Sequence, residues 1–236
     1  MITLGIDLAS MPKDTAACLV RWECDRAVAA APRLGCTDAD LDALIREADV
    51  IGIDAPFGWP DAFRAAVADW TAAEWTSDDA LRTNLRLRLT DRLIHERHGL
   101  MPLSVSTDRI ALPAMRAMAL QRRHDVTDRS GDGRFFEVYP AGSLKIWKHP
   151  HRGYKGLLPD NRDERLAALQ QLRTALPWLE IPSDCTSSDH AFDALVAALT
   201  ARCCATGQTL APSSAERAIA AREGWIHLPT AWPASD

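Results

Sequence analysis

Two aspartates end two apolar stretches that share the same local sequence. The tripeptide Gly-Ile-Asp occurs at 5–7 and again at 52–54, so that Asp7 and Asp54 each close a run of apolar residues. A carboxylate among buried apolar groups is costly unless it is paired, hydrogen-bonded or bound to a cation. If the two stretches are neighbouring parallel strands, the acids lie about one strand spacing, ~4.8 Å, apart. Ligands of open α/β sheets bind at that carboxyl edge, so the repeat predicts a site there.

Three further acids are candidates for the same site. Asp189 and Asp193 are four residues apart and share one face of an expected helix, at the border of its apolar stripe. A helix packed on the sheet by that stripe would point Asp193 towards the strand ends. Glu137 lies in an expected strand and is the weaker candidate, because its side chain could face the opposite side of the sheet.

Gathered carboxylates repel one another unless a hard divalent cation compensates their charge. Ligands that are all oxygen favour Mg²⁺ or Mn²⁺ over zinc. Two such ions would activate a water and stabilise the leaving oxygen in phosphodiester cleavage. In this hypothesis Asp7 bridges the ions, Asp54 and Asp193 each hold one, and Asp189 or Glu137 completes the shell.

A structural alternative exists for each acid taken alone. Asp7 and Asp54 could cap or accept hydrogen bonds in turns at the strand ends, and Asp189 is well placed to meet a helix N-terminus. Capping does not explain the matched strand ends together with an acid at the stripe border, so the joint pattern favours the metal site.

Charge is unevenly distributed along the 236 residues. The net charge is −5, yet residues 82–155 contain 15 Lys and Arg against 7 Asp and Glu, and the remainder contains 12 against 25. Arginine pairs well with phosphate, so the central segment could track a nucleic-acid backbone; a solvated helical surface explains it equally well. Trp59 and Trp147 could stack on a base, although packing is the more ordinary role of a tryptophan.

The pattern of elements predicts an α/β fold with a mixed sheet. Apolar or alternating segments indicate strands, and segments with helical periodicity indicate helices. The expected strands are 2–8, 15–22, 26–33, 50–54, 135–140 and a short segment within 224–229; the expected helices are 37–48, 61–75, 80–98, 111–124, 162–176, 189–202 and 214–222. Three strands, a helix and a fourth strand returning beside the first open such a fold. A single domain over 1–236, with a helical insertion at about 56–130, is the simplest organisation.

Several classes of protein are excluded by composition and motif. No apolar run approaches the ~18 residues of a membrane span, and the six cysteines show no zinc or disulfide spacing. We therefore expect a cytoplasmic protein with reduced thiols. Phosphate-binding, dinucleotide-binding and serine-hydrolase motifs are absent from the sequence.

Six segments together resemble a known family. They are GIDLAS (5–10), IDAPFGWP (53–60), RLTDR (88–92), EVYPAGSL (137–144), DHAFDALVAALTA (189–201) and EGWIHLP (223–229). In these segments the chain is similar to the family catalogued as domain of unknown function 429, whose members are regarded as predicted nucleases of the RNase H-like fold. The resemblance implies an RNase H-like five-stranded mixed sheet, with acids on both strands and the late helix. Asp193 resembles the helix acid of Holliday-junction resolvases, and Arg109 would line the cleft, unless it pairs with Asp108.

The sequence therefore predicts a metal-dependent nuclease acting on DNA or RNA, with Asp7, Asp54 and Asp193 as the catalytic residues. Five basic residues are expected to contact the substrate: Arg88, Arg109, Arg122, Arg123 and Lys145. Two alternatives stay open. One is a noncatalytic nucleic-acid-binding or scaffold protein of the same fold, and the other is a small-molecule phosphohydrolase. The sequence indicates neither the oligomeric state nor a preference between DNA and RNA.

Overall fold

The computed structural model describes residues 1–71, 78–131 and 133–235, and these divide into two compact units. The sheet unit comprises 1–54, 133–210 and 227–236; the helical unit comprises 55–132 and 211–226. None of the described helices has both the length and the apolar character needed to cross a membrane.

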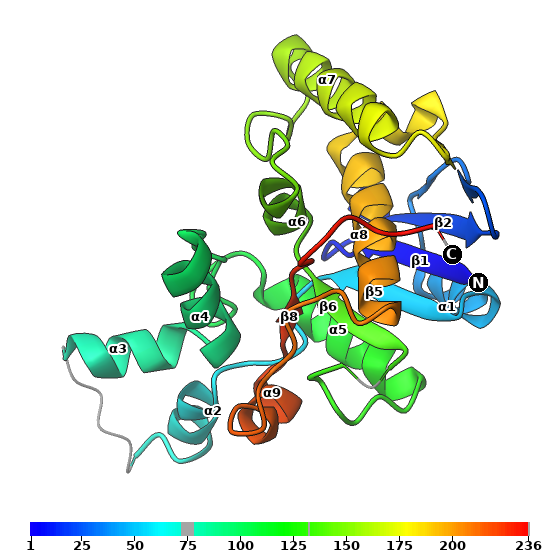
Figure 1. The fold of residues 1–236 in the computed structure, drawn as a ribbon. Coiled ribbons are helices and arrows are strands. Elements are labelled where there is room, and N and C mark those ends of the chain that lie inside the picture. The colour runs from blue at the N-terminus through cyan, green and yellow to red at the C-terminus, as the bar shows by residue number, and fades with distance from the viewer. Residues whose placement is uncertain (72–77, 132, 236) are drawn as a thin grey trace. The chain divides into compact units, whose positions relative to one another are not determined.

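The sheet unit is an α/β structure built on a mixed sheet (Figure 1). The strand order is β7-β3-β2-β1-β5-β6-β8, and β4 pairs with β2. The strands are β1 (Ile2–Asp7), β2 (Ala16–Trp22), β3 (Ala27–Ala29), β4 (Arg33–Leu34), β5 (Val50–Asp54), β6 (Phe135–Val138), β7 (Leu179–Glu180) and β8 (Ile226–His227). The helices are η1 (Pro12–Asp14), α1 (Asp38–Glu47), α6 (Pro140–Ile146), α7 (Pro159–Ala175), η2 (Ser183–Thr186) and α8 (Asp189–Ala205).

The predicted return of the fourth long strand beside the first is confirmed. Strands β1, β2 and β3 form an antiparallel meander, α1 follows, and β5 then pairs with β1 in parallel. Strand β6 continues the parallel part of the sheet beside β5. The five-stranded expectation was wrong in number, since the described residues contain eight strands. Strand β8 lies in the expected segment 224–229, whereas β4 and β7 have two residues each and are too short to show a period.

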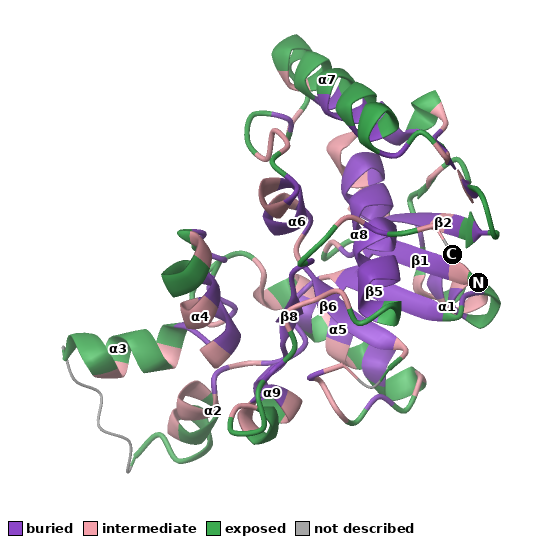
Figure 2. Ribbon diagram, in the orientation of Figure 1, coloured by how far each residue is buried: buried purple, intermediate pink, exposed green. Residues whose placement is uncertain are grey.

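Helix α8 packs directly on the sheet because glycines remove side chains from the contact. A Cβ atom on Gly5 would lie 2.0 Å from the carbonyl oxygen of Ala194, and one on Gly52 would lie 2.7 Å from that of Ala197. Leu4 and Ile6, which alternate with Gly5, are fully buried on the other face of β1. Figure 2 shows α8 buried along its length, which is more than the single apolar stripe expected.

The helical unit contains α2 (Asp61–Ala68), α3 (Asp79–Arg86), α4 (Leu89–His98), α5 (Ala111–Arg123) and α9 (Arg217–Glu223). The helix expected over 80–98 is interrupted at Leu87 and Arg88, which are extended. The Asp91 carboxylate accepts hydrogen bonds from the backbone and side chain of Arg88, and so caps α4. The helix expected over 61–75 ends at Ala68, and residues 72–75 of the expected range lie outside the described residues.

The contact between Gly5 and α8 makes a testable claim about stability. Gly5→Ala places a Cβ against the helix backbone, which cannot yield as a flexible side chain does. We expect the free energy of unfolding to fall by about 3 kcal/mol or more, measured by urea denaturation. Gly207→Ala is the control, because nothing lies within 4 Å of its Cβ and only its φ of +69° opposes the change, at about 1 kcal/mol. Equal losses in the two variants would contradict the close packing.

Candidate metal centre

Asp7, Asp54 and Asp193 converge at the carboxyl edge of the sheet. Asp7 and Asp54 are partners in the parallel register of β1 and β5. One carboxylate oxygen from each of the three residues lies within 4.8 Å of the others. Asp193 is buried, whereas Asp7 and Asp54 are partly exposed, so the group opens to solvent on one side.

The glycines that admit α8 also determine where the acids point. Side chains two residues apart in a strand share a face, so Asp7 and Asp54 project from the same face as Gly5 and Gly52. That face is the one covered by α8. Asp193 immediately precedes Ala194, the residue whose carbonyl oxygen meets Gly5. The close helix contact therefore brings the third acid beside the first two.

A loop before α7 supplies two hydrogen-bond donors to Asp193. The Tyr154 hydroxyl donates to Asp193 Oδ1 at 2.8 Å, and Lys155 Nζ lies 2.6 Å from Asp193 Oδ2. Tyr154 is fully buried, whereas about half of the Lys155 side chain is exposed. Both carboxylate oxygens of Asp193 thus have a partner. The partner of Oδ2 is the ammonium group of Lys155, whose half-exposed side chain can move into solvent.

The backbone of this loop is held by two side chains from elsewhere in the sheet unit. Buried Arg165 donates from Nη1 to the carbonyl oxygens of Tyr154 and Gly156, at 2.7 and 2.9 Å. The Asp189 carboxylate accepts from the Gly156 amide at 3.0 Å. Gly153 and Gly156 have φ of +79° and +112°, values that L side chains rarely adopt. These hydrogen bonds and backbone angles fix the backbone at Lys155, while its side chain stays half exposed.

His190 is the partner of Asp7. Its Nδ1 lies 2.6 Å from Asp7 Oδ2, and the imidazole is partly exposed. The hydrogen bond with Asp7 raises the pKa of His190, although partial burial opposes the charged imidazolium. His190 therefore provides a second positive charge at the edge of the acidic group when it is protonated.

Burial and mutual repulsion act against the carboxylates of the group. Burial raises the pKa of Asp7 to about 6, with Asp193 adding repulsion and the His190 hydrogen bond and Lys155 opposing it. Burial also raises the pKa of Asp54 well above its usual range, with Asp7 and Asp193 adding to the effect. Burial disfavours the charged form of Lys155, but attraction from Asp193 and Asp54 outweighs it and raises the pKa of Lys155. The cations of the chain thus compensate the three acids only in part.

The contacts of the three clustered acids differ from those expected of residues that cap a helix or accept hydrogen bonds in a turn. Asp7 contacts an imidazole, and Asp193 contacts a hydroxyl and an ammonium group. Within the part of the chain that the structure describes, the Asp54 carboxylate accepts no hydrogen bond. None of the three therefore serves to satisfy a backbone amide in those ranges.

The other two proposed ligands have contacts or orientations of their own, and their roles as ligands stay predictions. Asp189 does not cap α8, whose N-cap is Ser188; its carboxylate holds the Gly156 amide instead. Glu137 is in register with Ile53, not with Asp54. Since alternate residues face opposite sides, Glu137 projects from the face away from α8. It is nevertheless close enough to add to the repulsion that raises the pKa of Asp54.

The expected substrate-binding residues are scattered. Arg88 is 1% exposed and pairs with Asp91 at 2.9 Å, so its guanidinium is not available to a phosphate; here the sequence-based expectation was wrong. Arg109, Arg122 and Arg123 are exposed in the helical unit, and Lys145 is partly exposed in α6. Their binding roles stay predictions.

Sequence reasoning missed the residues nearest to the three acids. Tyr154 and Lys155 lie in an irregular loop, where no periodicity indicates what a side chain contacts, and their only signal is the flanking pair of glycines. His190 lies between two candidate acids in the sequence DHAFD, which was a usable signal. Tyr139 is a further neighbour: burial, followed by repulsion from Asp54, raises its pKa.

Comparison with known proteins yields one match. A family model described as a protein of unknown function (DUF429) matches residues 5–217, a range that includes all three clustered acids, Lys155 and His190. No curated protein and no solved structure matches the chain.

The raised pKa of Asp7 has a consequence for stability. A carboxyl group whose pKa is about 6 in the folded state and 3.8 when unfolded binds more protons when folded between these values. Stability contributed by this group is therefore present below pH 4 and is lost as the pH rises through 6. Asp7→Asn removes the loss, so we expect its free energy of unfolding at pH 7 to exceed that of the wild type by about 1–3 kcal/mol. Urea denaturation across this pH range measures it.

Asp25→Asn, which changes an exposed acid in the turn between β2 and β3, is the matched control and should follow the wild-type pH profile. A less stable Asp7→Asn protein at pH 7 would show that Asp7 stabilises the fold, and would contradict this account.

Proposed function

The chain belongs to the DUF429 family, and we propose that it is a metal-dependent nuclease that hydrolyses phosphodiester bonds at Asp7, Asp54 and Asp193. The observation that carries this proposal is the approach of the three carboxylates to within 4.8 Å at a partly open strand edge. The family description names no activity, so the argument depends on the chemistry of this group.

The donor set fits a hard divalent cation. All three donors are carboxylate oxygens, which favour Mg²⁺ or Mn²⁺. Two unit charges 4.8 Å apart repel by about 3–4 kcal/mol at the effective dielectric constant of such sites. Lys155 and His190 offset part of this repulsion, and the raised pKa values of Asp7 and Asp54 are consistent with the remainder. A bound divalent ion would supply the missing charge.

The residues of the chain then have separate tasks. Asp7, Asp54 and Asp193 would hold the divalent ion, which would lower the pKa of a bound water and stabilise negative charge on a phosphodiester. Tyr154 fixes the orientation of Asp193 through Oδ1. Lys155, with half of its side chain in solvent, can leave Asp193 Oδ2 and offer its ammonium to a phosphate oxygen. His190 holds Asp7 Oδ2 and carries a proton at the edge of the site.

We further propose that the sheet is of the RNase H-like type. The antiparallel β1-β2-β3 meander, α1, and the parallel β5 and β6 support this assignment. The placement of acids on β1, β5 and a late helix that covers the sheet also supports it.

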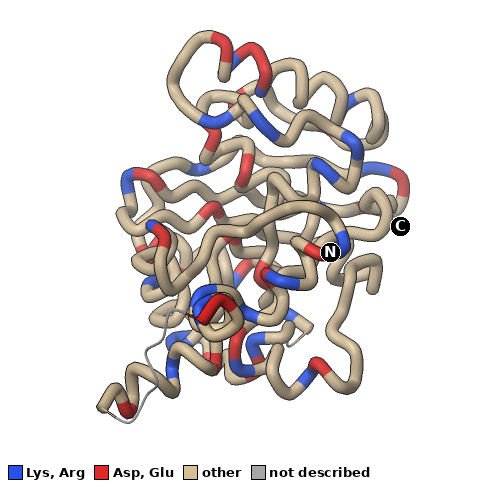
Figure 3. Tube along the Cα trace, turned by 90° about the vertical axis from the view of Figure 1, so that its left-hand side faces the viewer, with Lys and Arg blue, Asp and Glu red and all other residues tan. Residues whose placement is uncertain are grey.

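Nucleic acid is the proposed substrate because of the basic excess over 82–155. Several arginines of that segment, however, pair within the chain: Arg82 with Asp79, Arg88 with Asp91, and Arg97 with Glu216. Figure 3 shows acidic residues interspersed with basic ones along the chain. A small-molecule phosphohydrolase and a noncatalytic nucleic-acid-binding module therefore stand as the rivals that experiment must separate.

Metal binding is the first test. Mn²⁺ or Mg²⁺ at 100 times its dissociation constant should stabilise the fold by about 2.7 kcal/mol, measured as a rise in the unfolding midpoint. Asp7→Asn and Asp193→Asn should lose this rise, whereas Asp25→Asn should keep it. Calorimetric stoichiometry tests whether Asp7 bridges two ions. An equal rise in all four proteins would place the ion elsewhere.

Cleavage is the second test. Wild-type protein with Mn²⁺ is incubated with single-stranded, duplex and branched DNA and RNA, and with a chromogenic phosphodiester. We expect nicking of a nucleic acid that falls at least about 100-fold in Asp7→Asn, the scale of losing one electrostatic stabiliser of the reaction. Asp25→Asn should cleave as the wild type does. Hydrolysis of the chromogenic ester alone would favour the phosphohydrolase, and binding without cleavage would favour the module.

A further inference from the structure

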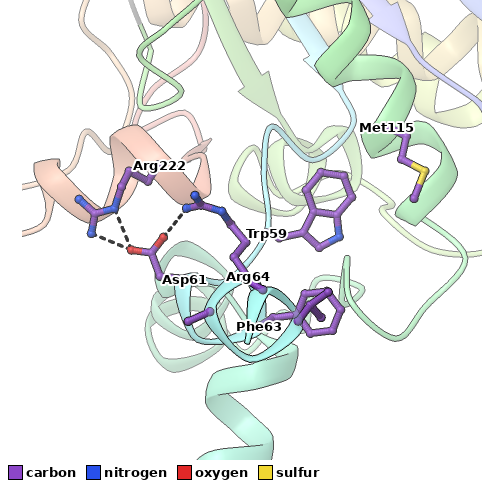
Figure 4. A pocket seen from close by; sticks show the side chains of 9 residues that line it. Trp59, Asp61, Phe63, Arg64, Met115 and Arg222 are labelled. Carbon is purple, nitrogen blue, oxygen red and sulfur yellow. Dashed lines mark hydrogen bonds and ion pairs between the residues drawn. The ribbon is translucent and has the colours of Figure 1, made fainter. Parts of the chain in front are cut away.

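A pocket of about 840 Å³ lies within the helical unit, among residues of α2, α5, α9 and the segment before α2. Its lining falls into two kinds, shown in Figure 4. Trp59, Phe63 and Met115 supply rings and a thioether, and Ala65, Val67 and Ala68 add aliphatic surface. Arg64, Arg222 and Asp61 supply charge. Trp59 and Phe63 are only partly buried, so their rings are accessible to a ligand.

The charged part of the lining carries more positive than negative charge. Arg64 pairs with Asp61 Oδ1 at 2.8 Å, and Arg222 pairs with Oδ2 of the same carboxylate at 2.7 Å. Two guanidinium groups thus share one carboxylate. Figure 4 shows the Arg64 guanidinium turned towards Asp61, with the indole of Trp59 on the other side of the Arg64 side chain, so charged groups and rings line different parts of one pocket.

Two charged residues just outside the lining, Arg129 and Glu223, do not change the excess of positive charge in the pocket. Burial lowers the pKa of Arg129, and repulsion from the nearby Arg64 lowers it further. Its Nε is buried and has no hydrogen-bond partner among the described residues. Glu223 is near Arg222, but its carboxylate accepts from the amides of Asp61 and Leu89. Three guanidinium groups against two carboxylates leave one formal positive charge.

We infer that this pocket binds one nucleotide of an unpaired strand, with the base against Trp59 and Phe63 and the phosphate beside Arg64 and Arg222. Proteins bind single-stranded nucleic acid through aromatic rings, on which bases stack, and through positive charge, which attracts the phosphates. The lining of this pocket contains both. The volume is in the range of small-molecule sites, and partly exposed walls allow the strand to continue in both directions. The site is separate from the acidic group, and the inference does not depend on the nuclease proposal.

Other ligand classes fit the lining less well. An apolar ligand would cover Arg64 and Arg222 and remove their remaining N–H groups from water, which is costly without compensating hydrogen bonds. A cation would meet an excess of positive charge. In a duplex the base is already stacked, so only an unpaired base offers its face to Trp59.

The experiment measures binding alone. A labelled short oligothymidylate, an abasic strand of the same length and a duplex of the same length are titrated with the full chain in EDTA, and the anisotropy of the label is followed. The wild type should bind oligothymidylate about 5- to 150-fold more tightly than the abasic strand, which is the range that stacking of one base supplies. The duplex should bind more weakly than oligothymidylate.

Three variants assign this preference to the pocket. Trp59→Leu and the milder Phe63→Leu should reduce the preference for bases over the abasic strand, and leave affinity for the abasic strand unchanged. Arg64→Gln should weaken both strands and reduce the salt dependence of binding. Trp70→Leu is the matched control, since Trp70 is a 69% exposed tryptophan of the same unit outside the pocket lining, and it should bind as the wild type does.

Equal affinity for the abasic strand and oligothymidylate in the wild type would overturn the inference, as would Trp59→Leu and Phe63→Leu proteins that keep the preference. Because no divalent ion is present, these outcomes say nothing against cleavage. Asp25→Asn should bind all three probes as the wild type does. Binding is read in EDTA and cleavage with Mn²⁺, so failure of the nuclease proposal and failure of this one are separable.

Discussion

The candidate site depends on one packing contact, the direct approach of α8 to the backbone of β1 and β5. Gly5 and Gly52 make it geometrically possible, since a side chain at Gly5 would overlap the helix backbone. The same alternation that turns these glycines towards α8 turns the following aspartates towards it. The packing of α8 on the sheet therefore also determines where the three carboxylates gather.

The electrostatics of the three acids show that stability alone does not explain why they are packed together. Burial and repulsion make the charged forms of Asp7 and Asp54 unfavourable, and Lys155 and His190 lie where they relieve part of this. The loop that carries Lys155 is itself held by Arg165 and Asp189. A fold selected for stability alone would gain by losing a carboxylate here. Sites that keep unfavourable charge are typical of functional centres.

Much of this arrangement could be predicted from the sequence, because it follows from local patterns. The repeated Gly-Ile-Asp strands predicted the parallel pairing and the neighbouring Asp7 and Asp54, and the border of a helical stripe predicted the side on which Asp193 lies. The loop of Tyr154 and Lys155 could not be predicted, since its position depends on hydrogen bonds with the Arg165 and Asp189 side chains and on two glycines with positive φ. The expectation for Arg88 failed for a related reason, since the exposure of an arginine is a tertiary property. Its guanidinium pairs with Asp91 and also donates to the carbonyl oxygen of Glu223, 135 residues away.

The glycine and the aspartate of each Gly-Ile-Asp repeat have different explanations. This difference helps to distinguish a structural site from a functional one. Packing of α8 explains Gly5 and Gly52 fully, but it does not explain an acid two residues later on the same face. Asparagine would fill the same space at position 54 without repulsion from Asp7 and Asp193. The Asp54 carboxylate accepts no hydrogen bond within the described ranges. Its charge is attracted by Lys155, but burial and repulsion from the other acids outweigh that attraction. Its negative charge is the property left to explain, and a ligand cation is the partner that requires it.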